Sequence, residues 1–552
     1  MKLNITKGIF ALSLLASALV ACKKINPTAG VATIVDGTFS QATVSFQFID
    51  AKTGIQLDLN NAEAIQVSVT GKNAADVVNN VGGTSITAGS GIMAVGLRFG
   101  VTPSTSNVVE FSVHATANGY LSIDKTVTIV QTGHQHFEVQ MIKFTDTPSG
   151  VSASQGTVSG VPSSGATVST FTLSPSLVAA SGTTASVTIP AGTTLMDANN
   201  VAVSGDVNTT LIYFNPNDDI ARQSFPSGLM NSKLSTGENV LFNTLGWVSM
   251  QMVTASGTEV KNFDTPIQMT MSIPDGKKDS AGNVITAGMS FGIYSHNDGG
   301  ATWKHESDAV VQLNGGTGKL EVTFNMTHLS DWQAADKNSL YGAESINQIT
   351  FKGDCPYYFN NTSDIIRDYI SSSLGVESSE IALINLNKPT YIIGKSPVYV
   401  GVTAKFRWYK KNNPSDFIEA SAENNVSSTV QLPASWCEPV KEFTIKLTTS
   451  CPDNPSRQIK PQCFVMAFEE GQFSSKWIPV GQMLNGVLKT STGVLKKNKR
   501  YTLVSFYQGK FVALTGDLGS FNFGAKLIDG NDIDLSRPLT DAECTYLRKI
   551  VG

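Results

Sequence analysis

Charged side chains are scarce in this chain of 552 residues. Asp, Glu, Lys and Arg make up 15% of it, against about 25% in an average globular protein. The formal net charge is -4, and no segment gathers Lys and Arg into a basic stripe. Nucleic acid is therefore excluded as an expected partner, because its phosphates are bound by clustered basic side chains.

Recognisable catalytic motifs are also missing. The sequence has no G-x-S-x-G elbow, no H-E-x-x-H zinc motif and no P-loop. His134 and His136 alternate along "TGHQHFE", a spacing that binds a metal only with a third ligand, and no such ligand can be named. We therefore expect no catalytic residue, metal site or cofactor, and we predict a protein that is not an enzyme. A glycosidase-type carboxylate pair stays open, because 44 acidic residues allow many pairs.

Cysteine is absent from residues 23–354, and the five cysteines other than Cys22 lie in the last two-fifths of the chain. No C-x-x-C pair or nearby histidine supports a metal site, so we expect a disulfide in this region. An odd number of cysteines leaves at least one outside any internal pair. The connectivity stays open among Cys355, Cys437, Cys451, Cys463 and Cys544.

Long apolar runs are missing except at the start, where "GIFALSLLASALV" follows the basic "MKLNITK". Its 13 residues are too short for a membrane span and typical of a secretory signal. "LVAC" then resembles the lipobox of Bacteroidota-type bacterial lipoproteins. That resemblance implies cleavage after Ala21 and acylation of Cys22, for example with palmitate, so that membrane lipid becomes a partner. An ordinary signal peptide with a chance cysteine is the alternative.

The residue after the cysteine is Lys23, and an aspartate that would retain such a protein at the inner membrane is missing. The lipobox resemblance therefore favours the cell outer membrane. Whether the protein lies on the periplasmic or the surface-exposed face stays open.

Alternating apolar residues indicate short strands. In "TVSFQFID", Val44, Phe46 and Phe48 point to one side while Ser45 and Gln47 point to the other. We predict an all-β protein of tandem β-sandwich domains, immunoglobulin-like or prealbumin-like, with one or two short helices in the C-terminal region. The expected order is a signal peptide (1–21), a tether (22–31), an N-terminal sandwich (32–145), a Ser/Gly-rich linker and edge (146–184), a second sandwich (185–340), a β domain with a short helix (341–450) and a C-terminal β domain with a terminal helix (451–552).

Residues 185–336 carry a family resemblance. The segments "VTIPAGTTLMDANNVAVSG", "SFPSGL" and "THLSDWQAA" resemble the extracellular β-rich module of astroprincin, cartilage intermediate layer protein and bacterial lipoproteins. The resemblance implies a β-sandwich in an extracytoplasmic protein, and it supplies no catalytic residues to carry over.

The stretch "SHNDGGATW", residues 295–303, resembles the Asp-box of sialidase propellers. A propeller needs one box per blade, whereas this chain has a single box and no blade-length repeat. His296 also stands where the box has serine. We therefore predict a β-hairpin with a glycine-containing turn.

Two segments predict short helices. "SDIIRDYISSSL" offers Ser363 as an N-cap and places Ile365, Ile366, Tyr369 and Ile370 on one helical face. "TDAECTYLRKI" offers a capping box made by Thr540 and Glu543.

Three aromatic residues are candidate ligand contacts. Trp408 and Tyr409 in "KFRWYKK", and Trp477 in "SSKWIP", could stack on sugar rings if exposed. Strand alternation predicts that either Trp408 or Tyr409 faces outward.

These features favour a membrane-anchored, non-enzymatic binding or adhesion module for a glycan or an envelope or host protein, acting through the distal domain. The alternatives are a periplasmic structural scaffold and, less favoured, a carboxylate-based glycan hydrolase. A long unpaired edge strand would favour the scaffold, because another protein can bind it by strand addition. Ligand identity and oligomeric state do not follow from the sequence.

Overall fold

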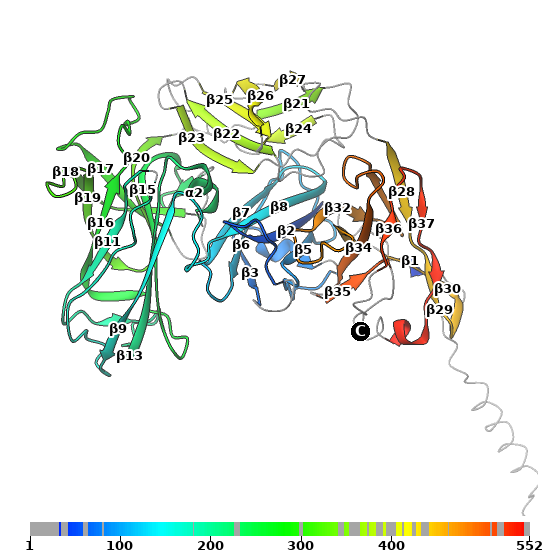
Figure 1. Ribbon diagram of the computed structural model, residues 1–552, viewed down its shortest axis with the longest axis horizontal. Coiled ribbons are helices and arrows are strands. Elements are labelled where there is room, and N and C mark those ends of the chain that lie inside the picture. The colour runs from blue at the N-terminus through cyan, green and yellow to red at the C-terminus, as the bar shows by residue number, and fades with distance from the viewer. Residues whose placement is uncertain are drawn as a thin grey trace, which may run out of the picture.

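The computed structural model of the chain is built almost entirely of β-strands (Figure 1). None of the helices among the residues it describes is long and apolar enough to cross a membrane. The structure describes residues 33–34, 42–58, 64–79, 82–179, 181–225, 232–296, 302–339, 347–352, 365–371, 375–381, 390–393, 404–410, 413–421, 427–431, 441–461, 463–507, 510–515 and 524–545.

The N-terminal sandwich (residues 42–141) has two layers, and β2 and β8 of its larger sheet are parallel. Val44, Phe46 and Phe48 enter its core, as the alternation predicts. Ser45 and Gln47, on the opposite face of β2, are buried as well, because other parts of the chain cover that face. One sheet has the order β4 (Val77–Asn79), β5 (Ile92–Leu97), β2 (Ala42–Asp50), β8 (Gly133–Met141), and the other the order β3 (Gln66–Thr70), β6 (Val109–Thr116), β7 (Ile123–Ile129).

The central sandwich (residues 151–339) is one continuous strand path folded into two layers. Its long strand β18 (Thr302–Leu313) pairs with one layer through its first part and with the other through residues 311–313. The first layer continues from β18 through β17 (Ser290–His296), β20 (Asp331–Ser339), β15 (Asn239–Thr254) and β13 (Gly205–Phe214) to β9 (Val151–Val161). The second continues through β19 (Leu320–His328), β16 (Asn262–Ile273) and β11 (Ala185–Ile189) to β10 (Phe171–Leu173).

The segment 146–184, expected as a linker and edge, holds β9 and β10, the two ends of that strand path. Residues 151–161 of this segment form β9, a regular strand of 11 residues, where a linker was expected. Val151, Val158 and Val161 of β9 are buried, which anchors an otherwise polar strand. The residues of β9 that are exposed to solvent are Gln155, Thr157, Ser159 and Gly160.

A short helix, α2 (Asp219–Ser224), follows β13 and was not expected from the sequence. Its N-cap is Asp218, whose side chain accepts a hydrogen bond from the backbone N–H of Ala221. The helix lies against β8 of the N-terminal sandwich, where Ser224 Oγ donates to Gln140 Oε1 at 3.1 Å. It therefore helps to join the N-terminal and central sandwiches.

The third unit (residues 347–431) also has two sheets, and it corrects one helix prediction. Residues Ile365–Ser371, expected to be helical, form β22, which pairs with a strand on each side. Isoleucine favours a strand with two neighbours over an isolated short helix; Ser363 lies outside the described residues. The sheets have the orders β24 (Thr390–Ile393), β21 (Asn347–Lys352), β27 (Ser427–Gln431) and β23 (Gly375–Ile381), β22, β25 (Ala404–Lys410), β26 (Asn413–Ser421).

The C-terminal unit (residues 441–545) has three small sheets. β28 and β29 pair with strands beyond residue 450, so the division expected near 450 falls inside this unit. Its sheets are β33 (Val487–Ser491), β28 (Glu442–Lys446), β37 (Ile533–Asp534); β1 (Thr33–Ile34), β30 (Asn454–Lys460), β29 (Thr449–Cys451), β38 (Arg537–Pro538); and β32 (Ile478–Met483), β31 (Cys463–Glu469), β34 (Arg500–Tyr507), β35 (Lys510–Ala513), with β36 (Lys526–Leu527) beside β34.

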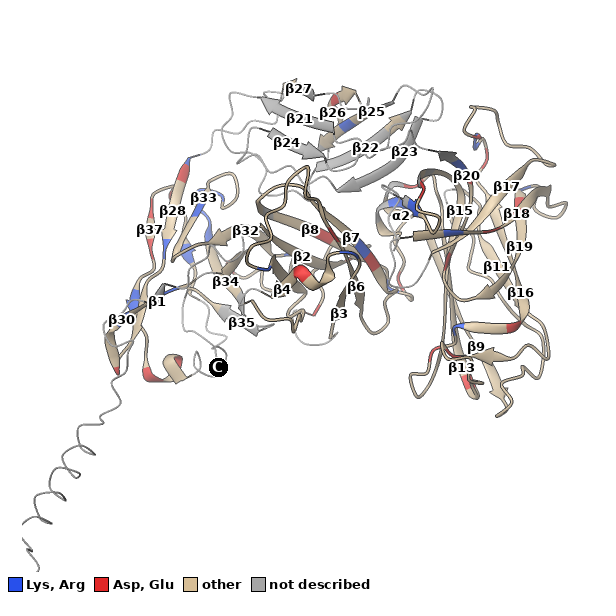
Figure 2. Cartoon of the chain, turned by 180° about the vertical axis from the view of Figure 1, so that it is seen from behind, with Lys and Arg blue, Asp and Glu red and all other residues tan. Residues whose placement is uncertain are grey.

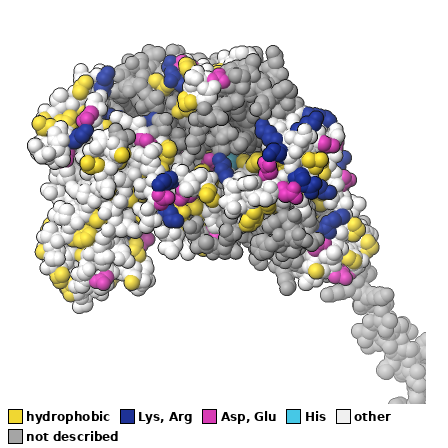
Figure 3. Space-filling view, in the orientation of Figure 1, with side chains coloured by type: hydrophobic (Ala, Val, Ile, Leu, Met, Phe, Trp, Pro, Cys, Tyr) yellow, Lys and Arg dark blue, Asp and Glu magenta, His cyan; other side chains and the backbone are white. Residues whose placement is uncertain are grey.

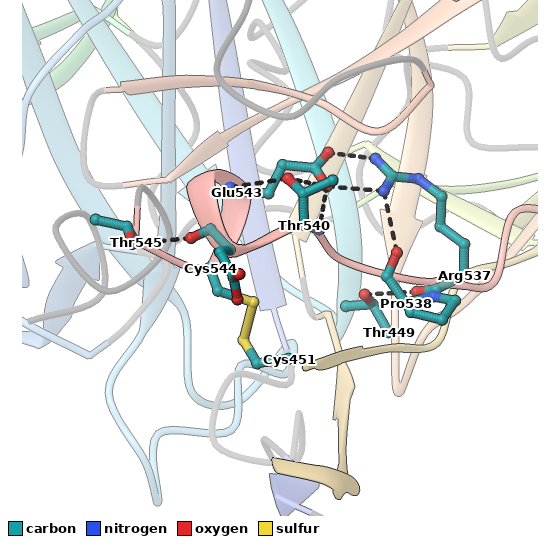
Figure 4. Close-up of a disulfide and its surroundings, with 9 residues drawn as sticks. Thr449, Cys451, Arg537, Pro538, Thr540, Glu543, Cys544 and Thr545 are labelled. Atoms are coloured by element: carbon teal, nitrogen blue, oxygen red, sulfur yellow. Dashed lines mark hydrogen bonds and ion pairs between the residues drawn. A yellow bond between two sulfur atoms is a disulfide. The ribbon is translucent and has the colours of Figure 1, made fainter. Parts of the chain in front are cut away.

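A disulfide and a capping box fix the terminal helix, residues 541–545, against β29 (Figure 4). Cys451 is bonded to Cys544, which confirms a disulfide in this region. Thr540 N donates to the Glu543 carboxylate at 2.7 Å and Glu543 N donates to Thr540 Oγ1 at 3.2 Å, so the capping box is confirmed. Arg537 also binds the carboxylate of Glu543.

Of the three remaining cysteines, Cys463 lies among the described residues and two do not. Cys463 is a free, buried thiol, and its burial raises its pKa to about 11. A thiol with so high a pKa carries little thiolate at neutral pH and is therefore unreactive. Cys355 and Cys437 lie outside the described residues.

The first and last parts of the chain pack on each other along what we call the seam. β1 pairs in parallel with β30. Gln47 Nε2 donates to the backbone carbonyl of Trp477 at 2.8 Å, and Trp477 N donates to Gln56 Oε1 at 3.2 Å. An apolar cluster fills the seam, made of Ile92, Phe464, Met466, Phe468, Trp477 and Val504.

The units are arranged along the long axis of the molecule (Figure 1). The central sandwich lies at one end and the C-terminal unit at the other, with the N-terminal sandwich between them and the third unit across the top. A second apolar cluster, which includes Leu121, Ile142, Phe214 and Trp247, joins the N-terminal and central sandwiches. The N-terminal sandwich therefore packs on both neighbours.

The seam predicts the effect of removing one charge. Lys476 forms an ion pair with Glu138, whose side chain is almost fully buried. Lys476→Ala leaves that carboxylate without its cation, and breaking a buried pair in this way costs about 3–5 kcal/mol. We expect faster hydrogen exchange in β8 and β31. Lys499→Ala, which removes an exposed pair with Glu469, is the control and should change exchange little. Unchanged exchange in the Lys476 variant would contradict the seam.

The disulfide predicts a second effect on stability. Cys451 and Cys544 are 93 residues apart, and closing a loop of this size is worth about 4.7 kcal/mol in the chain-entropy model. Replacing both residues by serine should lower the unfolding free energy of the C-terminal unit by about that amount, measured by urea denaturation. Reduction of the wild-type protein should reproduce the loss. Equal stability of the oxidised and reduced chains would refute it.

Candidate interaction site

The three aromatic candidates are buried. Trp408 and Trp477 are 0% exposed and Tyr409 is 7% exposed, so the prediction that Trp408 or Tyr409 faces outward is wrong. Both faces of β25 are covered at this pair, and Trp477 lies in the seam. None of these rings offers an open platform for a sugar in this structure.

The Asp-box stretch forms a hairpin, as predicted, from β17 and β18. The two strands pair in antiparallel fashion with His296 opposite Trp303. Both residues are buried, and their rings lie 5.1 Å apart. The turn itself, residues 297–301, lies outside the described residues. Trp303 of the motif is therefore part of the core.

A charged cluster beside this hairpin has its centre at Glu306. Ser295 Oγ and Lys304 Nζ donate to its carboxylate at 2.7 and 2.9 Å, and His328 Nε2 lies 4.0 Å away. Burial alone raises the pKa of Glu306, but these hydrogen bonds and charges outweigh it and hold the pKa below its usual value. Glu306 is therefore ionised at neutral pH, which suits an ion pair and not a general acid.

Of the two histidines on β8, His136 lies at the seam. His136 Nδ1 is 2.8 Å from Ser45 Oγ, and its ring stacks on Phe464. The side chain of His134 lies outside the described part of the structure. Among the described residues, no group of three or more His, Cys, Asp or Glu side chains is placed to hold a metal ion.

The outer side of β9 is the open edge of the central sandwich. β9 pairs with β13 along its length, and no other described strand pairs with it. A strand of 11 residues is about 36 Å long. We call the side of β9 that does not face β13 the free edge.

The backbone pattern shows which groups the free edge presents. Asn215 N donates to Gly150 O, so this pair is the hydrogen-bonded kind, and the kinds alternate along an antiparallel ladder. Ala153, Gln155 and Thr157 therefore belong to the other kind of pair with β13. Their backbone N–H and C=O groups point away from β13, toward the free edge.

The inner face of β9 touches the other layer without being paired to it. A Cβ built on Gly156 would lie 3.0 Å from the ring of Phe171 and 3.2 Å from Leu173 Cδ1, both on β10. β10 thus packs under β9, while the backbone groups of the free edge remain available. The sandwich is closed on one side by β18 and is open between β9 and β10.

The free edge carries no charge. From Thr147 to Met196 the sequence contains no Asp, Glu, Lys or Arg, and β9 is uncoloured along its length in Figure 2. The same end of the molecule shows mostly uncharged side chains in Figure 3. Natural edge strands usually carry lysine, proline or inward charges that prevent pairing with another chain. β9 lacks charge and proline over its 11 residues.

Part of this site could be found from the sequence. The charge-free segment 147–196 is visible there, and it was expected to include an edge. The sequence could not give the length of β9, its single pairing partner or the direction of its backbone groups, because these depend on β13, which lies about 50 residues further along the chain.

The backbone pattern predicts how β9 tolerates proline. Gln155→Pro should cost little stability, because the N–H that is lost points outward and donates to no strand. Ser154→Pro removes an N–H that donates to β13 opposite Leu211, and should cost about 1–3 kcal/mol. Thermal unfolding of the two variants is the measurement. Equal losses would show that the assignment of the free edge is wrong.

The comparisons with known proteins give no identity. No protein-family model matches the chain, and no curated protein matches it. Among solved structures, the chain is similar to the TIE protein of Bacillus anthracis, with 9% identity over 70% of this chain and 74% of that one and a TM-score of 0.12. It is also similar to BcpA, the major pilin subunit of Bacillus cereus, with 10% identity over 90% and 98% of the two chains and a TM-score of 0.14. For the pilus adhesin SpaC of Lactobacillus rhamnosus GG, the identity is 8% over 71% and 56%, with a TM-score of 0.13. Scores this low carry no argument about function.

Proposed function

We propose that this chain is a lipid-anchored, non-enzymatic protein of the bacterial cell envelope that binds another protein by strand addition at β9. The free edge is the observation that carries the proposal. Its outward N–H and C=O groups at Ala153, Gln155 and Thr157 match the pattern that an added antiparallel strand needs.

The chemistry of the edge defines the occupant. It is an extended polypeptide segment without charge, because a charged side chain would find no counterion along residues 147–196. The side chains of Gln155 and Thr157 are exposed and would contact side chains of the added strand. Such contacts at alternate residues give strand addition its specificity.

The energy of such binding is modest. Three residues offer six backbone groups, and a backbone hydrogen bond contributes about 0.5–1.5 kcal/mol net. Ordering the partner strand offsets part of this gain. Several anchored copies that bind together would compensate for weak single contacts.

The anchor in this proposal is Cys22. The apolar segment and "LVAC" support it, and Lys23 supports the outer membrane as the destination. Adhesion to another cell and a scaffold within the envelope both fit binding at β9. Glycan binding through aromatic side chains has no support from the three candidates, because Trp408, Tyr409 and Trp477 are buried.

A peptide with the sequence of residues 151–161, carrying a terminal fluorophore, is the defined probe for this proposal. The peptide has no charged side chain, and the same residues form a strand in the protein. The full chain should therefore bind the peptide and raise its fluorescence anisotropy. Gln155→Pro should abolish binding, because proline removes a donor and places a ring on the free edge. Gln155→Ala keeps the backbone donor and should still bind.

Hydrogen exchange locates the binding. The amides of Ala153, Gln155 and Thr157 should exchange more slowly with the peptide present. Absence of binding, or equal binding by the proline and alanine variants, would overturn the proposal.

A further inference from the structure

The N-terminal end of the described chain lies in the C-terminal unit. Thr33 pairs with Ile459 and Ile34 with Lys460, which makes β1 the edge strand beside β30. The pairing is parallel and joins segments from opposite ends of the sequence. The segment that leads to Cys22 therefore leaves the molecule at this sheet.

The connection from this sheet to the anchor is short. Ten residues separate Cys22 from Thr33, and a fully extended chain spans about 3.5 Å per residue. The edge of β1 therefore stays within about 40 Å of the lipidated cysteine. A bilayer that holds Cys22 must lie near the C-terminal unit.

The central sandwich lies at the other end of the molecule (Figure 1). The seam prevents the C-terminal unit from moving away from the N-terminal sandwich, because the bonds between Gln47, Gln56 and Trp477 and the pair of Lys476 with Glu138 cross it. The N-terminal sandwich in turn contacts the central sandwich, where Gln251 Nε2 donates to Ser122 Oγ.

We infer that the C-terminal unit faces the lipid surface and that the central sandwich, with β9, is the outermost part of the anchored protein. The inference rests on the lipid anchor of the proposed function. It reverses the order expected from a chain of modules in series, in which the last domain would be distal. The order is reversed because β1, near the start of the chain, pairs with β30 of the C-terminal unit.

Energy transfer to the membrane tests this orientation. The full chain is produced in its lipidated form and inserted into vesicles that carry an acceptor dye on their headgroups. A donor dye is attached through azidophenylalanine placed at Ser456, on β30, or at Ser256, in the turn after β15. Both serines are exposed, so labelling should preserve the fold. We expect a clearly larger loss of donor emission at Ser456 than at Ser256.

The possible results distinguish a wrong orientation from the absence of a lipid anchor. Equal or larger loss at Ser256 in vesicle-bound, lipidated protein would overturn the orientation and leave the anchor intact. Cys22→Ala should abolish lipid attachment, seen by mass spectrometry, and vesicle binding. If that variant binds vesicles as the wild type does, the anchor fails, and the orientation fails with it.

Discussion

The packing of Trp477 against the N-terminal sandwich is the contact on which the arrangement of the molecule depends. The indole is fully buried, and the backbone on either side of it bonds to Gln47 and Gln56. Gln47 lies on the outer face of β2, where a solitary sandwich would meet water, and Gln56 lies beside it, in the segment that follows β2. Burying amides there is favourable only because each finds a hydrogen-bond partner across the seam. The first and last units are therefore one packed body, and the N-terminal sandwich serves as the hub for both neighbours.

The sequence predicted the fold class because strand alternation is a local property. Val44, Phe46 and Phe48 give the period of two without any tertiary information, and the hairpin from His296 to Trp303 likewise follows from adjacent residues. The capping box at Thr540 is local as well. Each of these predictions is confirmed by the structure.

The predictions that failed depended on distant partners. Ile365 and Ile366 suit a helical face in isolation, but two neighbouring strands turn the segment into the interior of a sheet. Tyr409 and Trp408 are both buried, although alternation alone sends one of them outward. A local pattern shows that two faces exist, and only the assembled chain shows whether solvent reaches both. The free edge of β9 is the converse case, because an open side can be recognised only after all other strands are placed.

The pairing of β1 with β30 also constrains how this protein is made. A bond that links residues 430 positions apart, such as that from Gln47 to Trp477, forms only after most of the chain has been synthesised. The large loop must close before the contact can offset its entropy cost. Until then the face of β2 that carries Gln47 is exposed to water, which supplies the hydrogen bonds that Trp477 later provides. Assembly of the protein therefore follows the synthesis of most of the chain, because a segment near its start must wait for a segment near its end.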